Sequence, residues 1–95
     1  MYARVATFEN VNVPAMEERS KAALASGEMT LPEGCIRAMA LVDRHRLRNL
    51  FITFFESPGA IAAAEEHFEK MGEQIPEDVR GRRASVEVWE VAYES

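Results

Sequence analysis

The sequence predicts an α+β fold in which a single antiparallel sheet carries two helices on one of its faces. Three observations predict it. The hydrophobic patterns and turn residues indicate elements in the order β-α-β-β-α-β along 95 residues. That length suits one domain, residues 1–95, because a domain takes roughly 100–150 residues. Finally, 47% of the residues are hydrophobic, a large share for a short chain, since small domains bury the smallest fraction of their surface.

The first strand and the first helix are predicted within residues 2–26. Residues 2–8 are rich in β-formers and indicate a strand. Residues 10–14 interrupt that pattern, and Pro14 suits the first turn of a helix, where its missing N–H costs nothing. Gly27 is a typical C-terminal stop. At the spacing i, i+4, i+7 and i+8, one face of this helix carries Met16, Ser20, Ala23 and Leu24.

Two apolar runs in the middle of the chain predict a β-hairpin. They span residues 35–42 and 50–55, and the polar residues 43–46 between them indicate the turn. Neither run alternates cleanly between apolar and polar residues. Both strands are therefore expected to be covered on two faces, which is unusual for an antiparallel pair in a small monomer.

The second helix begins with Ser57 as N-cap and Pro58 in the first turn. Gly72 is expected to end it, residues 75–79 to add one loose helical turn, and residues 85–93 to form the last strand. The apolar face of the helix is predicted to be Ala60, Ile61, Ala64, Phe68 and Met71. The residues predicted to point outward are Glu65, Glu66, Glu69 and Lys70.

This element order is the split βαβ arrangement of ferredoxin-like domains. Right-handed crossovers place both helices on one face of the four-stranded sheet, which leaves the other face bare. Two bare faces brought together would bury the surplus of apolar residues. We therefore expect a face-to-face homodimer.

Composition excludes several classes of protein. The net charge is −5, which disfavours nucleic-acid binding, since that requires a basic face. No apolar run approaches the ~20 residues of a membrane span and no secretory leader is evident, so a cytoplasmic protein without membrane contact is expected. Cys35 stands alone, and His45 and His67 lie far apart. Neither a disulfide, a metal site nor a bound cofactor is therefore expected.

Two segments carry a family resemblance. They are Gly34 to Arg44, with the sequence GCIRAMALVDR, and Leu50 to Ala60, with the sequence LFITFFESPGA. A glycine, an apolar strand ending in Asp-Arg, a hairpin and a second apolar strand leading into an aromatic-Glu-Ser helix start together resemble the antibiotic biosynthesis monooxygenase-like family. Phe55 stands where Trp is common in that family, and the turn at 45–48 lacks the usual glycine.

The resemblance implies a dimeric α/β barrel but leaves the reaction open, because fold does not settle function. The superfamily includes cofactor-free oxygenases that turn phenols into quinones, haem-degrading oxygenases, small isomerases and proteins with no known reaction. The first hypothesis is a cofactor-free monooxygenase for a small apolar or aromatic, phenolic substrate. The second is a non-catalytic dimer that binds a small ligand or serves as an accessory protein. Haem degradation ranks third, since the single tryptophan, Trp89, lies on the last strand and not on the second helix.

His67 is the candidate catalytic base, because histidine can take a proton from a bound phenol and leave an anion able to reduce O₂. The alternative is a histidine at the border of the apolar face, and a cavity beside His67 would separate the two. Asn10 is a weaker catalytic candidate, and a turn or capping residue is the favoured interpretation of it. The candidates for substrate contact, which equally suit the core or the dimer interface, are Trp89, Tyr93, Phe51, Phe68 and Met39.

Two groups of arginines are expected at one end of the sheet. Their members are Arg44, Arg46 and Arg48 in the hairpin and Arg80, Arg82 and Arg83 before the last strand. Together they would form an anion-attracting rim, or they are ordinary solvated charge.

Overall fold

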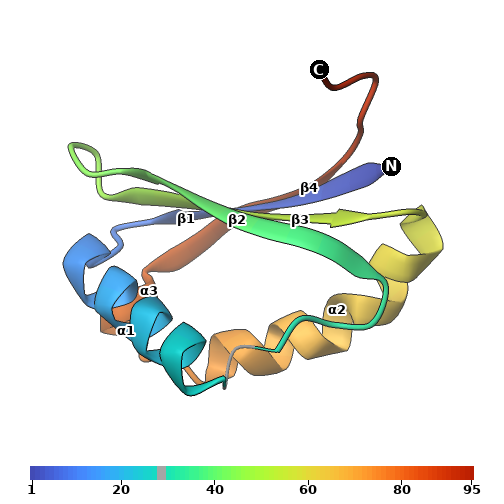
Figure 1. The fold of residues 1–95 in the computed structure, drawn as a ribbon. Coiled ribbons are helices and arrows are strands. Elements are labelled where there is room, and N and C mark those ends of the chain that lie inside the picture. Colours follow the sequence, from blue (N-terminus) through green and yellow to red (C-terminus); the bar gives the residue numbers. More distant parts are fainter. Residues whose placement is uncertain (28–29) are drawn as a thin grey trace.

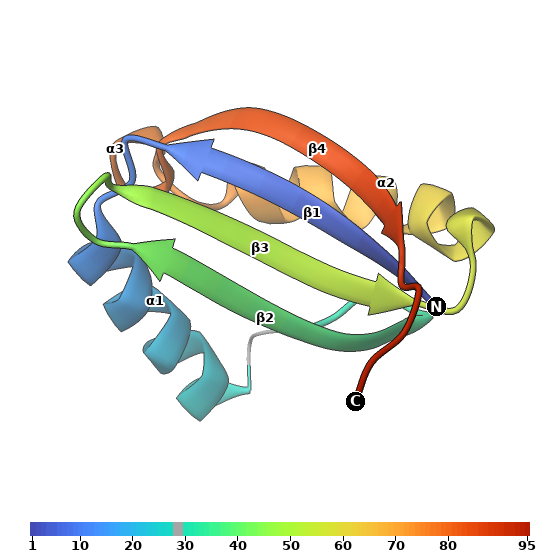
Figure 2. The same ribbon diagram turned by 90° about the horizontal axis from the view of Figure 1, so that it is seen from above.

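The computed structural model describes residues 1–27 and 30–95 and confirms the predicted ferredoxin-like architecture. The sheet has the strand order β2-β3-β1-β4 with antiparallel neighbours. Helices α1 and α2 both lie on one side of it, and the other face is uncovered (Figure 1, Figure 2). In chain order the elements are β1 (Tyr2–Glu9), α1 (Val13–Ser26), β2 (Cys35–Asp43), β3 (Arg48–Phe55), α2 (Pro58–Glu73), α3 (Glu77–Arg80) and β4 (Arg82–Glu90).

Local capping explains where the two long helices begin and end. The Asn12 side chain accepts a hydrogen bond from the Ala15 amide at the start of α1, and Gly27 ends that helix in the left-handed conformation, with φ 74°. At the start of α2, Ser57 Oγ accepts from the Ala60 amide at 3.1 Å. The predicted stop at Gly72 is one residue early. Gly72 is not among the residues with positive φ, and α2 continues to Glu73.

The last strand lies three residues earlier than predicted. β4 runs from Arg82 to Glu90 and not over 85–93, because its pairing partner in the sheet is β1. The register joins Arg82 to Glu9 at one end and Glu90 to Tyr2 at the other. The end of β4 lies opposite Tyr2, the first residue of β1, and one further backbone hydrogen bond, from Val91 to Met1, follows it. Tyr93 therefore falls in the segment that follows the strand.

The strand register assigns each residue to one face. On β1, Tyr2, Arg4, Ala6 and Phe8 face the helices, because Arg4 contacts α2. The face turned away from the helices, called the open face below, carries the alternate residues of every strand. Its apolar members on the strands are Ala3, Val5, Met39, Leu41, Leu50, Ile52, Phe54 and Trp89. The open face is the surface that the sequence analysis expects a second copy to cover.

The core lies between α2 and the sheet. Phe55 from β3 and Ile61, Ala64 and Phe68 from α2 are buried there, which confirms most of the predicted apolar face of α2. Helix α1 covers less. Val13 is its buried residue, and Leu24, predicted on the inward face, is 66% exposed. Among the described residues, no helix is long and apolar enough to cross a membrane.

Candidate functional site

A groove runs between α2 and the segment that leads into β2. Its volume is about 420 Å³, within the range of roughly 300–1,000 Å³ that small-molecule sites occupy. The lining residues that the structure describes are mostly small and apolar, with one carboxylate and one imidazole. The residues are Pro32, Glu33, Gly34, Ala60, Ala63, Ala64 and His67.

Small residues keep the groove open. A Cβ atom at Gly34 would lie 3.4 Å from the Ala60 Cβ and 3.9 Å from Phe55 Cδ1, so any larger residue would fill the floor. Gly34 also has φ +86°, which side chains rarely adopt. On α2, Ala60, Ala64 and His67 follow one another at helical spacing and share a side of the helix. The groove therefore has an apolar wall on α2 that ends at an imidazole.

His67 borders this groove and is held from two sides. Its Nε2 atom lies 3.0 Å from the backbone carbonyl oxygen of Thr30. Its ring meets Phe68 edge-to-face, with centroids 6.1 Å apart and an interplanar angle of 88°. A carbonyl oxygen only accepts, so we assign the proton of the neutral ring to Nε2. Nδ1 is then the ring nitrogen free to accept a proton.

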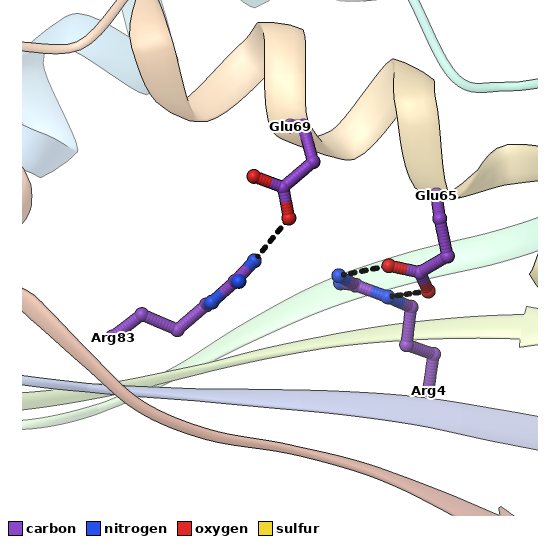
Figure 3. Close-up of polar contacts among 4 residues, drawn as sticks. All are labelled: Arg4, Glu65, Glu69 and Arg83. Carbon is purple, nitrogen blue, oxygen red and sulfur yellow. Dashed lines mark hydrogen bonds and ion pairs between the residues drawn. The ribbon is translucent and has the colours of Figure 1, made fainter.

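Beneath His67, a buried arginine ties α2 to the sheet. Arg4 is 2% exposed, and Glu65 accepts two hydrogen bonds from it, at 2.7 Å from Nε and 3.2 Å from the second terminal nitrogen (Figure 3). Its Cζ also lies 4.1 Å from the centre of the Phe68 ring, a cation–π geometry. The prediction that Glu65 points outward is therefore wrong, because the buried guanidinium needs a counter-charge.

Arg4 is not among the site residues predicted from the sequence. One signal was available: an arginine alternates with Tyr2, Ala6 and Phe8 on one face of a strand. A charge in such a row implies an acidic partner on the element packed above it. Arg4 contacts Glu65 and Phe68. These two residues lie two positions before and one position after His67 on α2. Arg4 thus fixes the turn of α2 that carries the imidazole.

A second ion pair joins α2 to β4. Arg83 donates to Glu69 at 2.8 Å (Figure 3). Glu69 is exposed, as predicted, and its carboxylate pairs with the edge strand. The hydrogen bond from Arg83 and the positive charge of that guanidinium lower the pKa of Glu69 below its ordinary value of 4.5.

The depressed pKa of Glu69 gives a prediction for acid pH. The native state holds fewer protons on Glu69 than the unfolded chain does, so this group stabilises the fold above pH 4.5 and loses its contribution as the pH falls through the lowered pKa. We expect Glu69→Gln to be less stable than the parent at pH 7 and to converge with it in acid. Urea titrations from pH 7 to pH 2.5 measure this. A stability difference between the parent and Glu69→Gln that stayed constant across that range would contradict the prediction. Glu66→Gln is the control, because the ion pair of Glu66 with Lys70 stays within α2.

The structure does not gather the predicted substrate-contact residues at one place. Phe51 and Phe68 lie on the helix side and pack edge-to-face in the core, with centroids 6.3 Å apart. Met39 and Trp89 lie on the open face, on the other side of the sheet from His67. Tyr93 is exposed in the segment after β4. Phe68 is the one among them that touches His67.

Asn10 lies at a turn and away from the groove lining. It is exposed, and its φ of 56° places it in the left-handed region that asparagine tolerates. Gly81 packs against its backbone. This geometry fits the turn interpretation of Asn10.

The arginine groups are mostly paired with acids, which fits ordinary surface charge better than an anion-attracting rim. In the hairpin, Arg44 bonds to Glu17, while Arg46 and Arg48 both pair with Asp43. The backbone N–H of Arg46 is the main cause that lowers the pKa of Asp43. Before and along β4, Arg82 pairs with Glu9 and Arg83 with Glu69. Over residues 1–27 and 30–95, no group of three or more histidine, cysteine or acidic side chains could hold a metal.

Comparisons with known proteins bear on the fold. No protein-family model matches the sequence, and no curated protein matches it significantly. Among solved structures, this chain is similar to a candidate antibiotic biosynthesis monooxygenase from Deinococcus radiodurans. The TM-score is 0.58 at 11% identity, over 100% of this chain and 96% of that one. At such low identity the likeness establishes the fold, and it is the fold that the sequence resemblance implies.

Proposed function

We propose that this chain is a cofactor-free, monooxygenase-like protein for a small phenolic substrate, with His67 as its general base. The observation that carries the proposal is the position of His67 on the groove, with Nε2 bonded to the Thr30 carbonyl. The fold shared with a candidate antibiotic biosynthesis monooxygenase and the resemblance of residues 34–60 to that family support it.

The first step is removal of a proton from the bound phenol. An aromatic ring lies against the small side chains of Ala60 and Ala64, and its hydroxyl reaches Nδ1 of His67. As the imidazolium forms, the Thr30 carbonyl accepts from its Nε2–H and stabilises the positive charge. The product of this step is an electron-rich phenolate.

The phenolate then supplies the electrons for the oxygenation. For a substrate whose phenol is the enol form of an anthrone-like ketone, the reacting carbon carries one hydrogen once the O–H proton is removed. The anion passes one electron to O₂, and the two radicals join at that carbon to form a C–O bond and a peroxide. The peroxide takes up the proton that His67 removed, and the O–O bond breaks as the hydrogen left on the carbon departs as a proton. That proton and the released hydroxide form water. One oxygen atom ends in the new carbonyl of the quinone and the other in water, so O₂ is reduced and the carbon oxidised.

We propose that the protein is a homodimer formed through the open face. Apolar side chains that the helices leave uncovered gather there, and a contiguous apolar patch on a small domain marks an interaction surface. Sedimentation measures this directly, because the chain has a mass of 10.7 kDa. A particle of that mass at high concentration would contradict the dimer.

Removal of His67 is the test of the catalytic role. We expect His67→Ala to lower O₂ uptake with anthrone- or quinol-like substrates by about 100-fold or more, since general-base catalysis contributes 10²–10⁴-fold. His45→Ala is the matched control, because His45 is exposed in the hairpin turn, and we expect it to retain full activity. Equal activity in parent and His67→Ala proteins would overturn the assignment.

The groove also supports the second candidate, a dimer that binds a small ligand without converting it. Its lining is largely apolar, and Glu33 is the one carboxylate among the lining residues that the structure describes, so binding alone needs no further group. Ligand binding by calorimetry together with no O₂ uptake in the parent protein would favour this candidate. The haem alternative fits poorly. Asn10 is not part of the groove, Trp89 lies on the opposite side of the sheet, and His67 is engaged by Thr30.

A further inference from the structure

The open face has a hollow at its hairpin end, where β1, β2 and β3 lie side by side. Its volume is about 160 Å³, well below the roughly 300 Å³ at which small-molecule pockets begin. Such a space suits a single large side chain. The hollow is lined by Thr7, Leu41, Val42, Asp43, Arg48 and Leu50.

Trp89 lies at the diagonally opposite corner of the same face. It is on the edge strand β4 and pairs with Ala3 near the start of β1, whereas the hollow borders the other edge strand, β2, near its end. The indole is 58% exposed, and Trp89 is the single tryptophan of the sequence. Exposed tryptophans surrounded by apolar residues are typical of interface anchors.

A two-fold axis can exchange these two corners. Two copies are placed with their open faces together, and the two-fold axis lies in the plane of the interface. If the axis follows the diagonal through the two corners that hold neither Trp89 nor the hollow, the rotation brings Trp89 of each copy onto the hollow of the other. The strands of the two sheets then cross at close to a right angle, which is one of the two preferred sheet packings. The contact is made twice, as the symmetry of a homodimer requires.

The chemistry of the hollow suits an indole. A buried indole needs an acceptor for its N–H, and Thr7 and Asp43 offer oxygen atoms at the rim. The guanidinium of Arg48, held 3.4 Å from Asp43 Oδ2, can lie over the ring as a cation–π partner. Leu41 and Leu50 supply the apolar wall.

From these observations we propose that Trp89 of each copy inserts into the hollow on the open face of a second copy and anchors the homodimer. The inference rests on the homodimer proposed above and adds the residue that holds it together. The occupant of the hollow is thus a side chain of this same protein, and not a small ligand.

The single tryptophan makes the test direct. Over a dilution series, we expect the Trp89 fluorescence to be blue-shifted and shielded from acrylamide at concentrations where sedimentation shows a dimer, and red-shifted where it shows a monomer. Trp89→Ala is expected to raise the dimer Kd by about 30-fold or more, the effect of losing an interface hot spot. Val88→Ala is the matched control. Val88 is an exposed neighbour on the helix side of the same strand, and we expect the Kd to change less than about 3-fold.

A mixing experiment separates this contact from general damage to the face. Leu41→Glu places a carboxylate in the hollow and should weaken the dimer as Trp89→Ala does. A mixture of the two variants regains one intact contact, because the tryptophan of one enters the intact hollow of the other. We therefore expect the mixture to associate more tightly than either variant alone, with circular dichroism confirming that both are folded.

The outcomes distinguish this inference from the proposal on which it depends. A dimer whose Trp89 fluorescence stays red-shifted and fully quenchable overturns the insertion of Trp89 but leaves the homodimer standing. A mixture that associates no better than the single variants also overturns it. A chain that remains at 10.7 kDa at millimolar concentration overturns the homodimer and this inference together.

Discussion

Glu65→Gln is expected to lower the free energy of unfolding by about 3 kcal/mol, because it leaves a buried charge without its partner. Arg4 is 2% exposed and donates two hydrogen bonds to the Glu65 carboxylate. A glutamine keeps one oxygen acceptor but removes the negative charge. For a domain of this size the melting temperature should fall by about 12–24 °C. Urea denaturation followed by circular dichroism measures both quantities.

Two variants test the physical reason for this effect. Glu66→Gln, one residue further along α2, alters an exposed carboxylate paired with Lys70 at i+4, and we expect a change below about 0.5 kcal/mol. Arg4→Met removes the buried charge and keeps an unbranched chain over Phe68. It should be much less harmful than Glu65→Gln. If Arg4→Met proved the more destabilising of the two, the unpaired-charge explanation would be wrong.

Gly81→Ala is the second substitution with a large expected effect. A Cβ atom there would lie 2.2 Å from the carbonyl oxygen of Glu9 and 3.0 Å from the carbonyl carbon of Asn10, both of them backbone atoms. The backbone angles, φ 75° and ψ −166°, belong to a region that only glycine occupies readily. Backbone strain at residue 81 and displacement of the end of β1 should together lower the free energy of unfolding by about 4 kcal/mol. We expect most of the stability of a domain this small to be lost.

Gly27→Ala is the matched control for the conformational part of that cost. Gly27 has nearly the same φ, +74°, but no atom of residues 1–27 or 30–95 outside its immediate neighbours lies within 4 Å of the position of its Cβ. The penalty is then the left-handed backbone alone, about 1–2 kcal/mol. Thermal unfolding of the two variants side by side measures the difference. Equal losses would show that the contact with Glu9 and Asn10 contributes nothing.

The fold was largely predictable because its determinants are local. Ser57 and Pro58 start α2, Gly27 ends α1, and the apolar runs on either side of residues 43–46 form the hairpin. The last strand was misplaced because strand limits depend on the partner. β4 stops at Glu90, opposite Tyr2, the first residue of β1. A single-sequence pattern does not contain that information.

The candidate site was predictable only in part. His67 stands out in the sequence as a histidine at the border of an apolar helix face, and the structure places it on a groove. The groove itself depends on the segment at Thr30 to Gly34 lying against α2, a contact between residues more than 25 positions apart. The buried pair of Arg4 and Glu65 spans 61 positions and has no pattern of its own along the chain.

The sequence by itself therefore determined the order of the elements, their caps and the surplus of apolar residues. Periodicity, turn residues and composition are properties of neighbouring residues, and they act before any tertiary contact forms. Only the tertiary structure decided which groups meet, Arg4 with Glu65 and His67 with the Thr30 carbonyl, and that Trp89 shares the open face with a hollow. Those contacts depend on strand register and helix docking, which the whole chain sets at once.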